Sequence, residues 1–446
     1  DHMYPPRQVQ GFYTKDQLRL MIHRRTIRKP LTKQHINTQT AGRYYQVEAI
    51  RRTAEAFENK KRHALLIMAT GTGKTRTAVA IIELLMKAGW VKNVLFLADR
   101  TELVRQAKNA FSQHLPHTSV INLLEEKEDD TSRVVVSTYP TMMNLIDQTK
   151  KAERRFSVGH FDLLIIDESH RSIYKKYGAI FDYFDALMLG LTATPKTDID
   201  RNTYRVFELE DDVPTFAYDY EQAIEDEYLV PAQPIKINMK LPRSGIKYSQ
   251  LSEEEKEAYE QEFTDAVTGE RPDEIGASAI NSWLFNEDTV DKALKLLMDK
   301  GIKVQGGDEL GKTIIFARNH RHAEFIVQRF NVLFPDKRGK FMTVIDHQVN
   351  YAQSLLNDFK VKDKDPRVAV SVDMLDTGID IPEIVNLVIL KKVNSKAKFW
   401  QMIGRGTRLC EDLFGPEQDK QEFYVFDFGG NLEFFEAFPE GKEAQT

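Results

Sequence analysis

The sequence contains a single cysteine, Cys410, so an internal disulfide is excluded, and we expect a reducing cytoplasmic location. It lacks any run of about 18 apolar residues, the length that a membrane-spanning helix needs, so no membrane association is expected. It also lacks an excess of basic residues, because the net charge is −5. Any nucleic acid is therefore expected to bind a local basic surface and not the chain as a whole.

The length and composition predict a protein of two or three globular domains. The 446 residues are 41% hydrophobic and 29% charged. Residues 1–40 are interpreted as an expression remnant and a basic linker whose partial helical period predicts a solvated helix, with a DNA-facing helix as the alternative. The domains are expected at residues 41–228 and 229–435, with a helical insert at about 245–306 and a polar tail at 436–446.

A glycine-rich loop carries the clearest motif. Leu65–Met68 is predicted to be a buried strand, and Thr75 opens a helix that continues to Gly89. Backbone N–H groups of such a loop can surround a phosphate at the positive end of a helix. Lys74 is expected to reach the β- and γ-phosphates, and Thr75 to ligate Mg²⁺. The residues expected to bind the nucleotide here are Thr70, Gly71, Thr72, Gly73, Lys74 and Thr75.

Apolar strands continue to alternate with helices after this loop. They are predicted at Val94–Ala98, Val134–Ser137, Leu163–Ile166 and Leu187–Leu191. This rhythm predicts a parallel sheet that is buried on both faces and carries functional residues at the carboxyl ends of its strands.

An acidic pair follows one of these strands. We expect Asp167 to hold Mg²⁺, partly through water, and Glu168 to orient and deprotonate the attacking water. A helix cap is the simpler explanation of such a pair, and the preceding phosphate loop argues against it. His170 and Thr192–Thr194 are expected to couple the nucleotide to the rest of the molecule, with a buried polar contact as a close alternative.

Gln46 lies shortly before the phosphate loop, ahead of a helix predicted at Val47–Phe57. A glutamine amide offers both a donor and an acceptor, which suits the N6 and N7 edge of adenine. Its position before the loop favours an adenine contact.

The second half of the chain repeats the strand and helix rhythm without a phosphate loop. Strands are predicted at Thr313–Ala317, Phe341–Ile345, Val368–Val372, Leu387–Leu390 and Phe423–Phe428. Arg405 and Arg408 lie beside Gln401 and Gly404, which favours a functional role over ordinary surface charge. From across an interdomain cleft they could neutralise charge on the γ-phosphoryl group, as an arginine finger supplied in cis does.

Together these motifs resemble those of superfamily 2 helicase motors. The segments that carry the resemblance are Ala69–Thr75, Asp167–His170, Thr192–Thr194 and Gln401–Arg408. The resemblance implies an α/β fold of two RecA-like domains, each a mostly parallel sheet covered by helices, with ATP in the cleft between them. By position in the family, Asp380 would contact the ATP ribose. Arg100, Thr138 and Thr377 would line the DNA track and contact phosphates, with a structural hydrogen bond as the alternative for each.

More narrowly, the chain resembles the restriction (R) subunit of type I restriction–modification enzymes, on residues 11–14, 42–46, 167–172 and 373–380. This implies an ATP- and Mg²⁺-dependent translocase on double-stranded DNA that assembles with methyltransferase and specificity subunits through regions absent here. The family cuts DNA with a separate N-terminal nuclease domain, which residues 1–40 are too few to hold. We therefore expect a motor without its nuclease.

Other functions share these motifs. A repair or recombination helicase that separates strands would be indicated by unwinding of a forked duplex. An RNA helicase would be indicated by RNA-stimulated ATP hydrolysis. A nucleotide-gated binding scaffold would bind ATP without turning it over.

Overall fold

The computed structural model describes residues 8–125, 132–146, 156–168, 171–194, 199, 201–235, 237, 246–247, 274–275, 287–349, 351–376 and 379–435. The chain divides into two compact units, Asp1–Leu229 and Val230–Thr446. Among the described residues, none of the helices combines the length and the apolar character that crossing a membrane requires.

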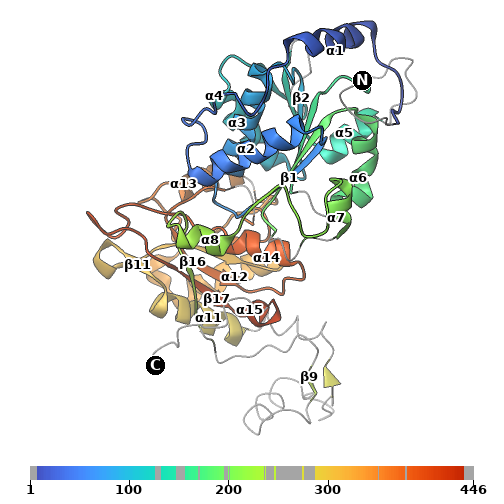
Figure 1. Ribbon diagram of the computed structural model, residues 1–446. Helices are drawn as coiled ribbons and strands as arrows, with labels where there is room; N and C mark the ends of the chain where they lie inside the picture. The colour runs from blue at the N-terminus through green and yellow to red at the C-terminus, as the bar shows by residue number, and fades with distance from the viewer. Residues whose placement is uncertain are drawn as a thin grey trace. The chain divides into compact units, whose positions relative to one another are not determined.

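The first unit is built on a seven-stranded sheet with the order β3-β4-β2-β5-β6-β1-β7, in which neighbouring strands run parallel (Figure 1). The strands are β1 His63–Met68, β2 Val94–Ala98, β3 Val120–Asn122, β4 Val134–Thr138, β5 Leu163–Asp167, β6 Leu187–Thr192 and β7 Phe216–Tyr218. The strands that the sequence predicts are present, with ends that differ by a residue or two, whereas β3 and β7 were not predicted.

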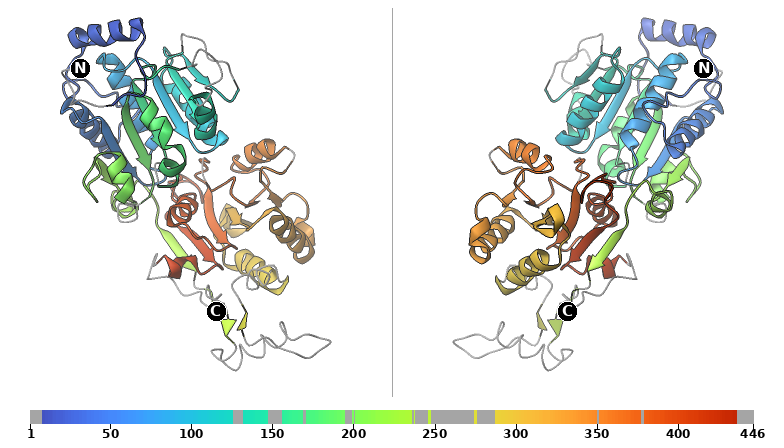
Figure 2. Two further views of the ribbon diagram at one scale, coloured as in Figure 1. Left: turned by 90° about the vertical axis from the view of Figure 1, so that its right-hand side faces the viewer. Right: turned by 90° about the vertical axis from the view of Figure 1, so that its left-hand side faces the viewer.

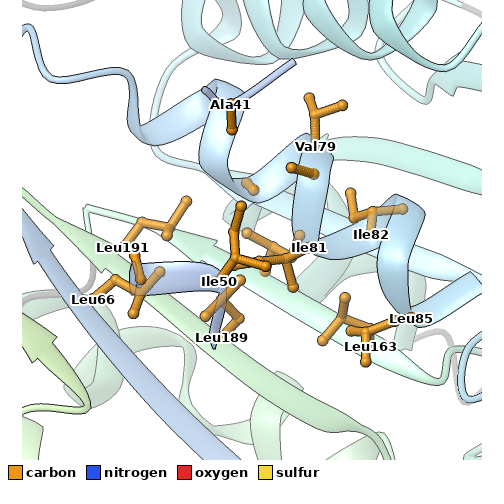
Figure 3. Close-up of a cluster of buried hydrophobic side chains, with 14 of the residues drawn as sticks. Ala41, Ile50, Leu66, Val79, Ile81, Ile82, Leu85, Leu163, Leu189 and Leu191 are labelled. Atoms are coloured by element: carbon orange, nitrogen blue, oxygen red, sulfur yellow. The ribbon is translucent and has the colours of Figure 1, made fainter. Parts of the chain in front are cut away.

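Helices cover both faces of this sheet because successive apolar strand residues point to opposite sides. Leu66 of β1 belongs to the core under α2, α3 and α4, while Leu65 belongs to the core under α5, α6 and α7. Figure 3 shows Ile50 and Ile81 of the first set of helices above Leu66 and Leu189 of the sheet. The helices are α1 Lys15–Ile27, α2 Tyr44–Glu58, α3 Lys74–Lys87, α4 Thr101–His114, α5 Tyr139–Ile146, α6 Arg171–Tyr183, α7 Arg201–Val206 and α8 Tyr220–Glu225.

The helix that the sequence suggests in the basic segment is present as α1, and most of its residues are exposed to solvent. Arg24 is buried, and its guanidinium forms a two-bond ion pair with the carboxylate of Asp162, with Nη2 and Oδ2 2.7 Å apart. Just before the helix, the Tyr13 hydroxyl donates to Asp185. A buried, bidentate pair holds a side chain in one geometry, so α1 is fastened to the first unit.

The second unit is built on a six-stranded parallel sheet with the order β14-β15-β13-β16-β17-β8. Its strands are β8 Ala232–Ile235, β13 Lys312–Phe316, β14 Met342–Val344, β15 Val368–Ser371, β16 Ile384–Ile389 and β17 Phe423–Asp427. Two short antiparallel pairs lie outside it, β9 Ile246–Lys247 with β10 Glu274–Ile275, and β11 Lys303–Val304 with β12 Glu309–Leu310. Figure 2 shows β8, in light green, beside the red β17 at one edge of the sheet.

The helices of the second unit also divide between two faces. Buried residues of α11 and α12 pack on one side of the sheet, and those of α13 and α14 on the other. The helices are α11 Glu287–Lys300, α12 His320–Leu333, α13 Ala352–Phe359, α14 Lys396–Ile403 and α15 Asn431–Phe434. Helix α11 falls within the range expected for an insert, yet it contributes Val290 and Leu294 to the core. Within the expected insert, residues 248–273 and 276–286 lie outside the described residues.

Candidate ATP-binding site

The glycine-rich loop connects the end of β1 to the start of α3. Gly71 and Gly73 have φ values of +102° and +88°, a left-handed region that glycine occupies without strain. Gly73 precedes the first residue of α3, and no side chain caps the helix there. The first N–H groups of a helix have no partner within it, so this end of α3 suits a phosphate.

The first turn of α2 donates hydrogen bonds to the backbone of the glycine-rich loop. The carbonyl oxygen of the buried Thr72 accepts hydrogen bonds from the Tyr45 hydroxyl at 2.9 Å and from Nε2 of Gln46 at 3.0 Å. Oε1 of Gln46 accepts from the backbone N–H of Arg43 at 3.3 Å. The glutamine expected to read adenine is therefore buried and bonded to the phosphate loop. One amide hydrogen and one oxygen lone pair are left for another partner.

Lys74 and Asp167 meet at the carboxyl end of the sheet. Nζ of Lys74 lies 3.3 Å from the carbonyl oxygen of Met68, and its charge favours ionisation of Asp167. Burial and the adjacent Glu168 outweigh that effect and raise the pKa of Asp167 to about 7. A carboxylate held in such a setting suits a cation. Among the described residues no cluster of three or more His, Cys, Asp or Glu could hold a metal alone, and Mg²⁺ commonly takes one or two carboxylates together with substrate phosphates.

Glu168 has two features that sequence does not reveal. Its φ is +52°, which is unusual for a residue with a side chain, and it is buried. Its Oε2 atom is buried without a hydrogen-bond partner among the residues that the structure describes. Strained backbone and an unpaired buried carboxylate oxygen both cost stability, and such costs concentrate at functional sites.

The strand ends beside Asp167 carry other predicted residues. The Tyr139 hydroxyl donates to the carbonyl oxygen of Asp167 at 2.8 Å, and the neighbouring Thr138 hydroxyl lies 2.9 Å from that of Thr141. Arg100, half-buried at the start of α4, has its Nε 3.7 Å from Oδ2 of Asp99. Thr138 and Arg100 thus stand at the ends of neighbouring strands β4 and β2.

Thr192, Ala193 and Thr194 form a Thr-Ala-Thr motif at the carboxyl end of β6. Thr192 and Thr194 are buried, and the backbone N–H of Thr194 donates to the Thr192 hydroxyl at 3.1 Å. The hydroxyl of Thr194 is buried without a hydrogen-bond partner in the described part of the chain. His170 and Thr377 lie outside the described residues.

The two predicted arginines of the second unit differ in their surroundings. Arg405 is buried, and its guanidinium donates to the carbonyl oxygens of Ile379 at 2.6 Å and Gln401 at 3.1 Å. Arg408 is partly exposed, and its Nε lies 2.7 Å from Oδ1 of Asp380. Arg408, which was expected to be the arginine finger, and Asp380, which was expected to contact the ribose, are therefore ion-pair partners.

Sequence reasoning missed Tyr45, Tyr139 and Arg43 as contributors to this region. For Arg43 and Tyr45 the sequence signal was the segment Gly42–Gln46, in which two tyrosines stand beside the glutamine. Tyr139 lies outside that segment. The hydroxyls of Tyr45 and Tyr139 act on backbone carbonyls that come near only in the folded chain.

Two family models match the chain. The family model described as "Type III restriction enzyme, res subunit" matches residues 39–197, and that of the helicase conserved C-terminal domain matches residues 292–410. The chain is 31% identical to the endonuclease subunit of the type I restriction enzyme EcoAI of Escherichia coli, over 88% of this chain and 46% of that protein. It is 29% identical to the EcoKI endonuclease subunit of Escherichia coli K12, over 86% of this chain and 34% of that protein.

A solved structure shares the fold. It is a fragment assigned as the HsdR subunit of a type I restriction enzyme from Vibrio vulnificus YJ016, with a TM-score of 0.67 and 24% identity over 98% of this chain and 75% of that chain. The chain spans less than half the length of the two Escherichia coli relatives. Both units are mostly parallel sheets flanked by helices, which confirms the predicted pair of RecA-like domains. The chain belongs to the superfamily 2 helicases, among the restriction (endonuclease) subunits of type I restriction enzymes.

Proposed function

We propose that this chain is an ATP-driven motor that moves along double-stranded DNA as part of a type I restriction enzyme. The observation that carries the proposal is the meeting of the glycine-rich loop, Lys74 and the Asp167–Glu168 pair at one end of one sheet. Phosphoryl transfer needs positioning and charge neutralisation more than covalent chemistry, and these groups supply both.

Each residue has a defined task in this proposal. Loop N–H groups and Lys74 bind the phosphates of ATP, and Thr75 with Asp167 holds Mg²⁺, which would neutralise phosphate charge. Glu168 orients the attacking water and accepts its proton, a role that suits the unpaired Oε2. The remaining hydrogen-bonding capacity of Gln46 serves adenine, and Asp380 serves the ribose.

Of the two arginines, Arg408 suits the role of a finger better. Its partner Asp380 is 73% exposed and Arg408 itself is partly exposed, so solvent screens the ion pair and Arg408 can exchange that carboxylate for a phosphate. Arg405 would have to leave two backbone carbonyls unpaired inside its own unit. We therefore propose Arg408 as the charge-neutralising residue and Arg405 as its structural support.

DNA would contact the ends of β2 and β4, where Arg100 and Thr138 stand, and the segment of Thr377. These residues are proposed to contact phosphates and not bases, as a motor that moves along any sequence requires. Methyltransferase and specificity subunits of a restriction enzyme are its proposed protein partners. We also propose that residues 1–446 alone do not cut DNA, which incubation with plasmid, Mg²⁺ and ATP tests.

Movement is tested by displacement of a third strand from a triplex placed on linear duplex DNA. We expect ATP-dependent displacement by the wild type and none by Lys74→Ala. ATP turnover without displacement would contradict translocation, and unwinding of a forked duplex would indicate a strand-separating helicase.

A further inference from the structure

We propose that Tyr45 and Arg43 are positioning residues that hold the phosphate loop and tie it to the segment by which the chain leaves the first unit. The inference rests on the proposed binding and hydrolysis of ATP. It concerns four side chains of the first unit, Arg43, Tyr45, Tyr218 and Tyr228, together with the Thr72 carbonyl, and we call this set the tyrosine brace.

The brace begins at the phosphate loop. Thr72 stands between Gly71 and Gly73, which have no side chains with which to anchor the loop. Its carbonyl oxygen is fixed instead by the Tyr45 hydroxyl and Nε2 of Gln46, at 2.9 and 3.0 Å. Because both donors come from the first turn of α2, the position of the loop depends on the position of that turn.

The same tyrosine hydroxyl also accepts a hydrogen bond. Nη1 of Arg43 donates to it at 2.9 Å, so Tyr45 connects a charged donor to the loop carbonyl. A hydroxyl that accepts from a cation becomes a better donor, because successive hydrogen bonds polarise one another. Loss of this hydroxyl would break both bonds while leaving the ring in place.

The far end of the brace reaches the end of the first unit. The guanidinium carbon of Arg43 lies 4.9 Å from the ring centroid of Tyr228, and the Tyr45 ring meets that of Tyr228 edge-on at 5.2 Å. Tyr45 also stacks on Tyr218 with centroids 3.9 Å apart. Tyr228 precedes Leu229, the last residue of the first unit, so side chains that hold the loop also hold the exit of the chain.

A shared network of this kind couples its two ends. A phosphate that orders the loop would favour the braced position of Tyr45 and so reduce the motion of residues 228 and 229. By thermodynamic reciprocity, anything that loosens this exit would weaken nucleotide binding. Neither effect is expected of a tyrosine that only fills the core.

Tyr45→Phe tests the brace, and Tyr183→Phe is its matched control. Tyr183 donates to the carbonyl oxygen of Phe156 at 2.6 Å and is buried, but it packs on the opposite face of the sheet. Each variant loses one buried hydroxyl bond to a backbone carbonyl, and Tyr45→Phe also loses the bond that Arg43 donates. Measured are the Kd for Mg²⁺ with a non-hydrolysable ATP analogue, the Tm, and hydrogen exchange of the Tyr228 and Leu229 amides, which both donate to the Ala223 carbonyl.

We expect the analogue to slow exchange at residues 228 and 229 in the wild type and in Tyr183→Phe. In Tyr45→Phe the Kd should rise by about 3- to 10-fold, the effect of one hydrogen bond, and the slowing should be lost. Arg43→Lys keeps the charge but removes the planar group over Tyr228, so it should lose the slowing with a smaller change in Kd.

Two results would overturn the inference while the proposed function stands. One is wild-type affinity and exchange in Tyr45→Phe. The other is an equal loss of Tm and affinity in Tyr45→Phe and Tyr183→Phe, which would make Tyr45 a core residue only. Failure of the wild type to bind the analogue would instead overturn the proposed function, and the inference with it.

Discussion

Arg408 and Asp380 form an ion pair, with Nε of the arginine 2.7 Å from Oδ1 of the aspartate. Arg408 is predicted to contact the γ-phosphate of ATP, and the family resemblance implies that Asp380 contacts the ribose. The pairing gives the Arg408 guanidinium a carboxylate partner, and the Asp380 side chain is 73% exposed. The neighbouring Arg405 is instead bonded to two backbone carbonyls and buried.

Arg408→Ala is expected to leave ATP affinity near that of the wild type and to lower turnover by about 10³, the scale of an arginine finger. Arg405→Ala should mainly destabilise the second unit, because two carbonyls lose their donor. Steady-state turnover, ATP affinity and urea unfolding of both variants separate these outcomes. Normal turnover in Arg408→Ala would show that the finger is assigned to the wrong residue, and a main loss of DNA affinity would place it in the DNA track.

Glu168→Gln should bind ATP as the wild type does and hydrolyse it more slowly by orders of magnitude. The amide keeps the shape of the side chain but cannot accept the proton of the attacking water. Single-turnover hydrolysis beside direct ATP binding provides the measurement. A variant that turns over at close to the wild-type rate would remove Glu168 from the chemistry.

Gly73→Ala should weaken ATP binding by about 10-fold or more. An alanine there would adopt φ near +88°, a left-handed conformation that costs about 1–2 kcal/mol. Its Cβ would also lie 2.5 Å from Nε2 of Gln46, so the Gln46 side chain that donates to the Thr72 carbonyl would have to shift. The control is Gly178→Ala in α6, where an added Cβ meets nothing within 4 Å and should stabilise the helix slightly. Equal ATP affinity in the two variants would argue against a tightly held loop.

The buried Lys420 is expected to make the free energy of unfolding depend on pH. It is buried, and Nζ donates to the carbonyl oxygens of Pro382 at 3.0 Å and Ile384 at 2.5 Å. Burial lowers the pKa of Lys420 to about 7, so above that pH the unfolded chain binds more protons than the folded one. The free energy of unfolding should therefore rise between pH 7 and pH 9.

Urea unfolding of the wild type, Lys420→Met and Lys360→Met across this interval measures the effect. Lys360 is an exposed lysine, so its variant should retain the wild-type slope. Lys420→Met should have a shallower slope, with the remainder supplied by the other buried lysines, Lys312 and Lys391, whose pKa values are also lowered. An unchanged slope in Lys420→Met would contradict a neutral lysine in the folded protein.

The strands of both sheets could be predicted where the chain is continuously apolar, as at Val94–Ala98, whose observed limits are the same. β7 was missed because Phe216–Tyr218 is too short to show a pattern. β8 was missed because Pro231 and Pro234 are of a residue type that usually interrupts a strand. Pro234 is tolerated because β8 is an edge strand, so its missing N–H breaks no ladder on the outer side.

The candidate site could be predicted only as far as single motifs allow. The glycine-rich loop and the acidic pair could be recognised from residue type and spacing. The left-handed backbone of Glu168, the pairing of Arg408 with Asp380 and the contact of Tyr45 with Thr72 depend on segments brought together by folding. No local pattern in the sequence encodes those relationships.

The rate of ATP hydrolysis with double-stranded DNA, single-stranded DNA and RNA in parallel, at one stated salt concentration, tests whether the chain is a motor on duplex DNA. An ATP-driven motor on duplex DNA should show strong stimulation by double-stranded DNA, weaker stimulation by the other two, and none in Lys74→Ala. Stimulation by RNA above that by duplex DNA, or ATP binding without any hydrolysis, would contradict this function.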